Sequence, residues 1–238
     1  PRSRIIENGG QGHMASFILN DIKLRVPGKA LTASLRTALE SGHYEWNEAA
    51  AIDRHVKRGD RVLDIGAGAG YISILAGRKA GPENVIAVEG NAVMMDVLRR
   101  NLDHNGSAET ALVHGAVVAD NYDEDTVLFA NRDAFWSSSI ADDTVRPDRL
   151  AEVPALKLSD LLEQYRPTIV SMDVEGGELE LCQQPWPVHV RLVIMEIHTK
   201  KYPPSGVKAI FDGMSRNNMT IMPWGTRGEV IVLQRCDR

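Results

Sequence analysis

Residues 62–70 read VLDIGAGAG, an apolar strand followed by a loop with glycine at every second position. The next residues, 71–79, have the apolar spacing of a helix. Glycine permits positive φ and lets the backbone approach a ligand closely. The free N–H groups at the start of the following helix suit a carboxylate or another anionic group. The stretch therefore predicts a nucleotide-type binding site at the end of a buried strand.

Strands and helices alternate on both sides of this loop. Apolar runs predict strands and helical periodicity predicts helices, with strands over 61–65, 85–89, 110–114, 168–174 and 192–197, and helices over 92–105, 158–165, 178–182 and 207–217. This alternation indicates a mostly parallel α/β sheet covered by helices on both faces. The last two strands, 219–222 and 229–234, are joined by a short segment with two glycines, so we expect them to pair antiparallel.

The segments before the glycine loop are expected to extend this core. Residues 1–13 lack periodicity and resemble the remnant of a cleaved expression tag. Residues 14–56 predict a small cap, made of a hairpin around Asn20-Asp21 and two helices. Residues 57–238 form the main domain, with an irregular insertion at about 116–154. Such an insertion is typical of a lid or a binding loop, and a solvated excursion is the alternative.

The composition is that of a globular protein, and it argues against nucleic acid and membrane as partners. The chain has 238 residues, 43% of them apolar, which suffices for one α/β domain with a substantial core. A formal net charge of −5 disfavours a groove that follows a phosphate backbone. Apolar runs stay short of the roughly 20 residues that cross a bilayer, and two cysteines fit a reducing compartment. We therefore expect a cytoplasmic protein that binds neither nucleic acid nor membrane.

Two details of the glycine loop favour S-adenosylmethionine (AdoMet) over NAD. The dinucleotide fingerprint is G-x-G-x-x-G, whereas here the third glycine arrives one residue early and Tyr71 fills its place. Asp64, just before the glycines, suits the cationic methionine end of AdoMet and would repel a pyrophosphate. Glu89, at the end of the next strand, is placed to accept hydrogen bonds from both ribose hydroxyls. Turn glycines beside a solvated acid are the alternative explanation.

Residues 44–198 resemble the FkbM-type methyltransferase family. The pieces that match are Tyr44-Glu45, 62–70, 86–89, Asn101 with Asn105, 173–178 and 196–198. The resemblance implies a class I AdoMet-methyltransferase fold, Rossmann-like with seven strands, and O-methylation of a small-molecule hydroxyl on a sugar or polyketide-type acceptor. Two positions depart from the family, where Gly90 replaces a proline and Ser171 a lysine. The cofactor site that we expect comprises Glu45, Asp64, Gly66, Gly68, Gly70, Glu89, Gly90 and Asn91.

Asp173 and His198 follow strands that should flank the strand of the glycine loop. Ligands of an open α/β sheet bind beyond the carboxyl ends of its strands, so both side chains should face the cofactor. Because AdoMet carries an activated methyl group, the protein has to align the acceptor and remove its proton. We expect Asp173 and His198 to carry the reaction, with Glu175 in support. A structural histidine and a helix-capping carboxylate are the alternatives.

Other chemistries stay open at this point. Asp173, Glu175 and Glu196 could offer oxygen ligands to Mg²⁺, yet the sequence assigns no metal site. An N-methyltransferase is one alternative, although the segment 173–175 lacks the Asn/Asp-Pro-Pro-aromatic motif of enzymes that methylate nucleic acid bases. A non-catalytic AdoMet-binding protein is the other alternative.

Overall fold

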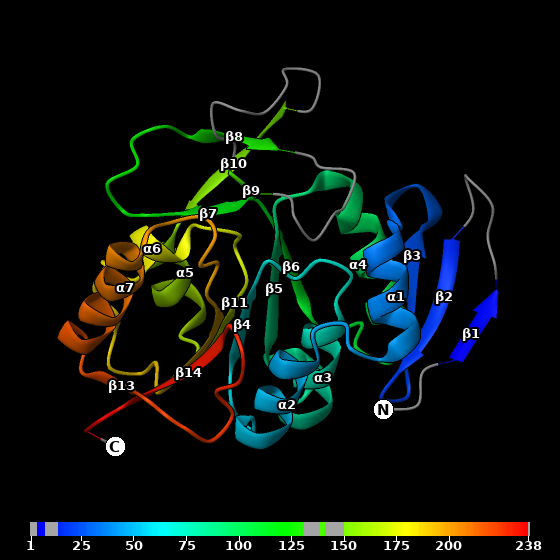
Figure 1. The fold of residues 1–238 in the computed structure, drawn as a ribbon, viewed down its shortest axis with the longest axis horizontal. Coiled ribbons are helices and arrows are strands. Elements are labelled where there is room, and N and C mark those ends of the chain that lie inside the picture. Colours follow the sequence, from blue (N-terminus) through cyan, green and yellow to red (C-terminus); the bar gives the residue numbers. More distant parts are fainter. Residues whose placement is uncertain (1–3, 8–13, 131–138, 141–149, 238) are drawn as a thin grey trace.

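The computed structural model describes residues 4–7, 14–130, 139–140 and 150–237 (Figure 1). Its largest sheet is built from β4 (Val62–Ile65), β5 (Val85–Glu89), β6 (Ala111–His114), β11 (Ile169–Met172), β12 (Leu192–Glu196), β13 (Met219–Ile221) and β14 (Val230–Arg235). The order of these seven strands is β13-β14-β12-β11-β4-β5-β6. Neighbouring strands pair parallel along the part of the sheet with the order β12-β11-β4-β5-β6. Strand β14 pairs antiparallel with both of its neighbours. The predicted mostly parallel α/β sheet and its antiparallel end are confirmed.

Helices cover both faces of this sheet. One group is α2 (Trp46–His55), α3 (Tyr71–Ala80) and α4 (Ala92–His104), and the other is α5 (Leu158–Tyr165), α6 (Glu178–Leu181) and α7 (Pro204–Arg216) (Figure 1). Val62 packs in the core of the first group and Leu63 in the core of the second, because successive side chains of a strand point to opposite faces. Among the described helices, none is long and apolar enough to cross a membrane.

The N-terminal segment packs against the first helix group. It contains β2 (Met14–Leu19), β3 (Ile22–Pro27), α1 (Ala33–Ser41) and β1 (Arg4–Glu7), which pairs with β2 inside the stretch expected to be a tag remnant. Short 3₁₀ turns lie at Gly28–Ala30 and Pro82–Asn84. The hairpin of β2 and β3 was predicted, with its turn at Asn20-Asp21.

Asn101 of α4 and Asn105, the C-cap of that helix, hold β3, and Asn101 also bonds the glycine loop. The Asn101 side chain accepts from Arg25 N at 2.9 Å and donates to Arg25 O at 3.0 Å, and Asn105 bonds Lys23 N and O in the same way. The two amides therefore replace the neighbouring strand that β3 lacks on this edge. Asn101 is fully buried and also donates to the carbonyl of Ala69, inside the glycine loop, at 2.8 Å.

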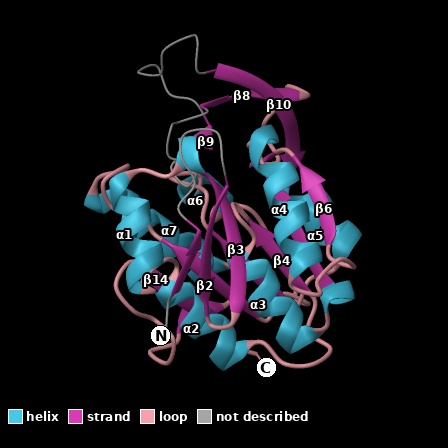
Figure 2. Cartoon of the chain, turned by 90° about the vertical axis from the view of Figure 1, so that its right-hand side faces the viewer, coloured by secondary structure: helices cyan, strands magenta, loops and turns pink. Residues whose placement is uncertain are grey.

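The region expected to be an irregular insertion contains a second sheet. Its strands are β7 (Ala116–Val118), β8 (Thr126–Ala130), β9 (Ser139–Ile140) and β10 (Leu150–Lys157), in the order β7-β10-β8-β9. Figure 2 shows β8, β9 and β10 at the top of the view, beyond one end of the main sheet. Residues 131–138 and 141–149, which belong to the expected lid, lie outside the described residues. The pairing of β7 with β10 joins distant segments, which local periodicity does not reveal.

Two glycines with nearly the same φ angle allow a test of how closely the backbone after β4 packs against the backbone after β11. Gly66 has φ +87°, and a Cβ there would lie 1.9 Å from the carbonyl oxygen of Asp173. Gly59 has φ +86°, and a Cβ there would have no atom within 4 Å. Gly59→Ala should cost only the left-handed strain, about 1–2 kcal/mol. Gly66→Ala should lower the free energy of unfolding by more than about 3 kcal/mol, since backbone must move. Urea denaturation measures both, and equal losses would contradict this account.

Candidate active site

A cavity opens at the carboxyl ends of β4 and β5, where the glycine loop lies. Gly66, Gly68, Glu89 and Gly90 line it, together with apolar residues that include Val88, Val117, Phe129 and Ile140. The second sheet therefore supplies the apolar wall opposite the loop. A cavity with one apolar wall and one wall made of the glycine-loop backbone and a carboxylate has the character of a nucleoside site.

The glycine loop is held open by positive φ angles and by contacts with neighbouring strands. Gly66, Gly68 and Gly70 have φ of +87°, +53° and +90°. Gly66 N and Ala67 N both donate to the carbonyl of Val88, at 3.0 Å each. The loop therefore turns immediately beyond β4, and Gly70 caps α3 without lining the cavity.

Glu89 braces the loop as well as lining the cavity. Its Oε2 accepts a hydrogen bond from Gly68 N at 2.7 Å, and its Oε1 accepts one from Asn91 N at 2.6 Å. Burial raises the pKa of this carboxyl, and the backbone N–H groups of Asn91, Gly68 and Gly90 partly offset the shift. Each oxygen keeps a lone pair for a further donor, as the two ribose hydroxyls of AdoMet would require.

Gly90 and Asn91 have separate tasks beside Glu89. A Cβ on Gly90 would lie 2.7 Å from the ring of Phe129, so the packing of this ring favours glycine here. Asn91 lies outside the cavity lining and caps α4, its side chain accepting from Val93 N at 3.0 Å.

Asp64 lies beneath the glycine loop. Its side chain is 3% exposed, lines neither this cavity nor the adjoining cleft, and accepts a hydrogen bond from Ser73 Oγ at 2.5 Å. Burial raises its pKa to about 6, against the effect of this hydrogen bond. In this position Asp64 ties β4 to α3.

A second, acidic cleft adjoins the cofactor cavity. Tyr44, Glu45 and Asp173 line both, so the two spaces share a wall. Six carboxylates surround this cleft, those of Glu45, Glu48, Asp173, Glu175, Glu196 and Glu229. The shared wall means that an acceptor in the cleft would lie next to a cofactor in the cavity.

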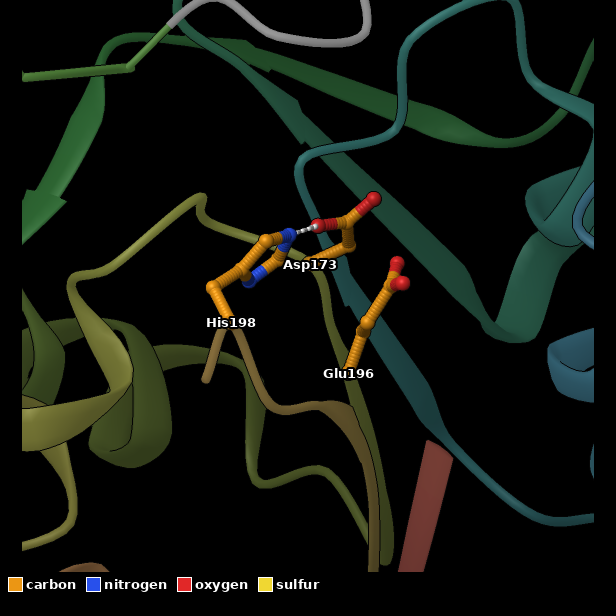
Figure 3. Close-up of side chains that lie close together, drawn as sticks. All are labelled: Asp173, Glu196 and His198. Atoms are coloured by element: carbon orange, nitrogen blue, oxygen red, sulfur yellow. Dashed lines mark ion pairs between the residues drawn. The ribbon is translucent and has the colours of Figure 1, made fainter. Parts of the chain in front are cut away.

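His198 lies among the carboxylates of the cleft, and Figure 3 shows two of them, Asp173 and Glu196, beside its ring. Its Nδ1 donates to Glu178 Oε1 at 2.7 Å, and the Glu178 side chain is fully buried. Its Nε2 points toward Asp173 Oδ1, at 3.4 Å, and Glu175 Oε2, at 3.5 Å. The three predicted catalytic residues, Asp173, Glu175 and His198, are therefore neighbours at the cleft.

Several carboxyl groups in this cleft have raised pKa values. Burial, and then the charges of Glu196, Glu45 and other acids, raises the pKa of Asp173 well above its ordinary value. Burial raises the pKa of Glu48 to about 7, and the nearby Glu196 adds to the shift. Burial alone would lower the pKa of His198, but the hydrogen bond and charge of Glu178 raise it. Such crowding of like charge is typical of functional sites.

Two non-glycine residues of the cleft have left-handed backbone. Glu45 has φ +46° and Glu175 has φ +53°. This conformation is uncommon for a residue with a side chain and costs about 1–3 kcal/mol at a strained site. Both residues therefore carry strain next to the place where the cofactor cavity meets the cleft.

Asp173, Glu196 and His198 are spaced as metal ligands. One donor atom from each lies within 4.8 Å of the others, and no other such group is found among the described residues. The imidazole makes this set a poor match for Mg²⁺, which prefers oxygen ligands.

Sequence reasoning overlooked Glu48 and the part played by Glu178. Glu48 lies on the buried face of α2 beside Ala49 and Ile52, and a charged residue among apolar ones on one helical face was the available signal. Glu178 entered only as part of the matching segment 173–178, because its hydrogen bond to His198 joins residues 20 positions apart in the sequence.

Comparison with known proteins identifies related sequences over part of the chain. A family model for the TRM5/TYW2 methyltransferase domain matches residues 41–134. Ribosomal protein L11 methyltransferases of an Exiguobacterium species and of Acetivibrio thermocellus are 36% identical over 63 residues and 39% identical over 70 residues. These matches cover 26% and 29% of this chain and only 20% and 22% of the relatives. The matched part thus spans about a fifth of those relatives.

Among solved structures, Trm5b from Pyrococcus abyssi is similar in fold. It superposes with a TM-score of 0.51 at 14% identity, covering 95% of this chain and 56% of that one.

These findings overturn two expectations. The resemblance to the FkbM-type family is wrong as a family assignment, because the model that matches is the TRM5/TYW2 methyltransferase domain. Short glycine and acidic motifs are shared across methyltransferases that bind the same cofactor, so they did not separate the families. The expected absence of a nucleic acid partner is contradicted by the same match, since that family acts on tRNA. The net charge was a poor guide to this partner, because it sums the charges of the whole chain and does not report how they are distributed over the surface. The chain has the class I AdoMet-methyltransferase fold.

Proposed function

We propose that this chain is an AdoMet-dependent methyltransferase whose acceptor is a nitrogen of a tRNA base. The observation that carries the proposal is the acidic cleft that shares Tyr44, Glu45 and Asp173 with the cofactor cavity. The TRM5/TYW2 match over residues 41–134 supports the choice of tRNA. The carboxylates of the cleft can accept hydrogen bonds from the N–H groups of a base edge.

 

AdoMet, when bound, supplies an activated methyl group, and the residues of the cavity fit it. Glu89 offers acceptors for the ribose, the glycine loop lets the backbone approach the methionine end, and Phe129 and Ile140 offer an apolar wall for the adenine. Glu45, at the shared wall, supplies negative charge for the ammonium group. We propose this set, with Asp64, Gly66, Gly68, Gly70, Gly90 and Asn91 as its supports, as the cofactor site.

Around the cleft lie groups suited to the base faces and the phosphates of a nucleotide. Arg227 lies over the ring of Trp46, a residue that lines the cleft, with 3.8 Å between the guanidinium carbon and the ring centroid. A base taken out of its stack is commonly held by such aromatic and guanidinium planes. Lys200 is exposed next to His198, and Lys201 lies 3.9 Å from Glu175, so cations for phosphate contacts are close by.

Asp173 and His198, with Glu175 in support, carry the reaction in this proposal. Methylation of an N–H group releases a proton, which a group of the cleft must receive or a bound cation must make easier to lose. The Nε2 atom of His198 and the oxygens of Asp173 and Glu175 are the atoms nearest to one another there. We also propose that residues 14–56 act as a cap on the methyltransferase domain of residues 57–238.

Loss of Glu89 should weaken AdoMet binding and leave NAD unbound in both proteins. Glu89→Ala removes the ribose acceptors and also frees Gly68 N and Asn91 N, so AdoMet affinity should fall by about 1.5–3 kcal/mol. Titration calorimetry measures the change, with Glu83→Gln as control because this exposed acid lines neither space. Tight NAD binding without AdoMet binding would refute the cofactor assignment.

Transfer of a labelled methyl group decides the acceptor. Incubation of the protein with methyl-labelled AdoMet and unmodified tRNA transcripts should label the RNA, and nucleoside analysis should place the label on a base nitrogen. Parallel reactions contain ribosomal protein or simple sugars and alcohols. Label in those acceptors, with none in tRNA, would refute the proposed acceptor while leaving the cofactor assignment intact.

His198→Ala should lower turnover by about 10²–10⁴-fold with AdoMet affinity unchanged, because the imidazole serves the acceptor side. His104→Gln is the matched control, since His104 is an exposed residue of α4 that contacts only Arg100 O. Asp173→Asn should lower turnover as well, whereas a carboxylate that only caps the next helix would tolerate asparagine. Full activity in both variants would place the reaction elsewhere.

A further inference from the structure

We propose that Asp173, Glu196 and His198 bind a divalent transition-metal ion in the acidic cleft. The three side chains come from separate points on the same sheet edge, after β11, at the end of β12 and just beyond it. Figure 3 shows the Asp173 carboxylate and the His198 ring turned toward each other, with Glu196 beside them. Their donor atoms lie within 4.8 Å of one another.

The distances around His198 are those of neighbouring ligands. Its Nε2 is 3.4 Å from Asp173 Oδ1, which is long for a hydrogen bond. Two ligands at about 2.1 Å from one metal ion lie about 3.0–3.5 Å apart at right-angled or tetrahedral coordination. Asp173 Oδ1 is inaccessible to solvent and has no hydrogen-bond partner among the described residues. An ion between these atoms would satisfy it.

Glu178 prepares His198 for this task. Metal-binding histidines usually donate their second ring N–H to a carboxylate, which fixes the tautomer and orients the ring. His198 Nδ1 donates to Glu178 Oε1 at 2.7 Å, and this directs Nε2 into the cleft. Glu178 is fully buried, and Gly176 N donates to the same oxygen at 3.2 Å, so the carboxylate is held from two sides.

A buried hydroxyl provides an independent sign of a missing ligand. Tyr44 is 6% exposed and lines the cleft, yet its Oη has no hydrogen-bond partner among the described residues. Burial raises the pKa of this phenol, as do the charge of Glu45, a contact with that carboxylate that falls short of hydrogen-bond geometry, and the charges of Asp173 and Glu48, so the hydroxyl lies close to the carboxylates. A hydrated ion among those carboxylates would offer the hydroxyl a partner.

The donor set selects the kind of ion. One imidazole with two carboxylates suits Mn²⁺, Fe²⁺ or Zn²⁺ better than Mg²⁺ or Ca²⁺. The crowded negative charge of the cleft favours any divalent cation, and the imidazole supplies the discrimination. The site itself does not depend on the acceptor, whereas a role for the ion in turnover rests on the proposed function.

Calorimetry on the full chain, stripped with a chelator and dialysed, tests the site without AdoMet or acceptor. Titration with MnCl₂ and with ZnCl₂ should each show one ion per chain, and bound Mn²⁺ should broaden its electron paramagnetic resonance signal. MgCl₂ should bind at least tenfold more weakly. Absence of Mn²⁺ and Zn²⁺ binding would overturn the site.

Variants locate the ion. Asp173→Asn and His198→Asn should abolish binding, and Glu178→Gln, which keeps the shape but removes the charge, should weaken it by about 10–100-fold. Glu229→Gln is the matched control, because Glu229 lines the same cleft outside the donor set and bonds Thr199 Oγ1 at 2.9 Å. Equal weakening in Glu229→Gln and Glu178→Gln would mean diffuse attraction to an acidic surface and overturn the site.

AdoMet titration of each variant keeps the two proposals apart. Circular dichroism and a thermal melt show that each variant is folded, so lost ion binding then belongs to the site. A wild-type chain that binds Mn²⁺ but not AdoMet would refute the proposed function and leave the ion site standing.

Discussion

The close approach of Gly66 to Asp173 is the contact on which the site depends. Parallel strands β4 and β11 pair in register, with Ile65 opposite Met172, so both chains leave the sheet at the same level. The backbone of one must then pass the backbone of the other, and only a residue without a side chain leaves room. The cofactor loop and the acidic cleft are therefore parts of one rigid crossing, and neither can shift without the other.

Around this crossing the chain places crowded acidic side chains, which lower the stability of the fold. The Asp173 carboxyl is crowded by Glu45, Glu196 and Glu175, and burial adds to the difficulty of ionising it. Left-handed backbone at Glu45 and Glu175 adds strain in the same place. The remainder of the fold offsets these costs by ordinary means, with apolar strands packed between two helical layers.

The cofactor half of the site was accessible from the sequence because its signals are local. The glycines, Glu89 and the strand before them lie close together in the chain, and strand ends in a parallel sheet predict that Asp173 and His198 meet. Glu48 and the pairing of β7 with β10 were missed, since both depend on contacts between segments far apart in sequence. Family and acceptor were missed for another reason: the motifs report the cofactor, and the acceptor is recognised by surfaces that share no fixed pattern.

The bond from Asn101 to the carbonyl of Ala69 has a consequence for how the chain assembles. Asn101 also pairs with Arg25, so one amide joins three segments separated by more than 30 and more than 70 positions. Ordering such distant segments carries a loop-closure entropy that local helices do not. We therefore expect the glycine loop and the N-terminal hairpin to become ordered together, so that competence for the cofactor depends on the docking of a segment far away in the sequence.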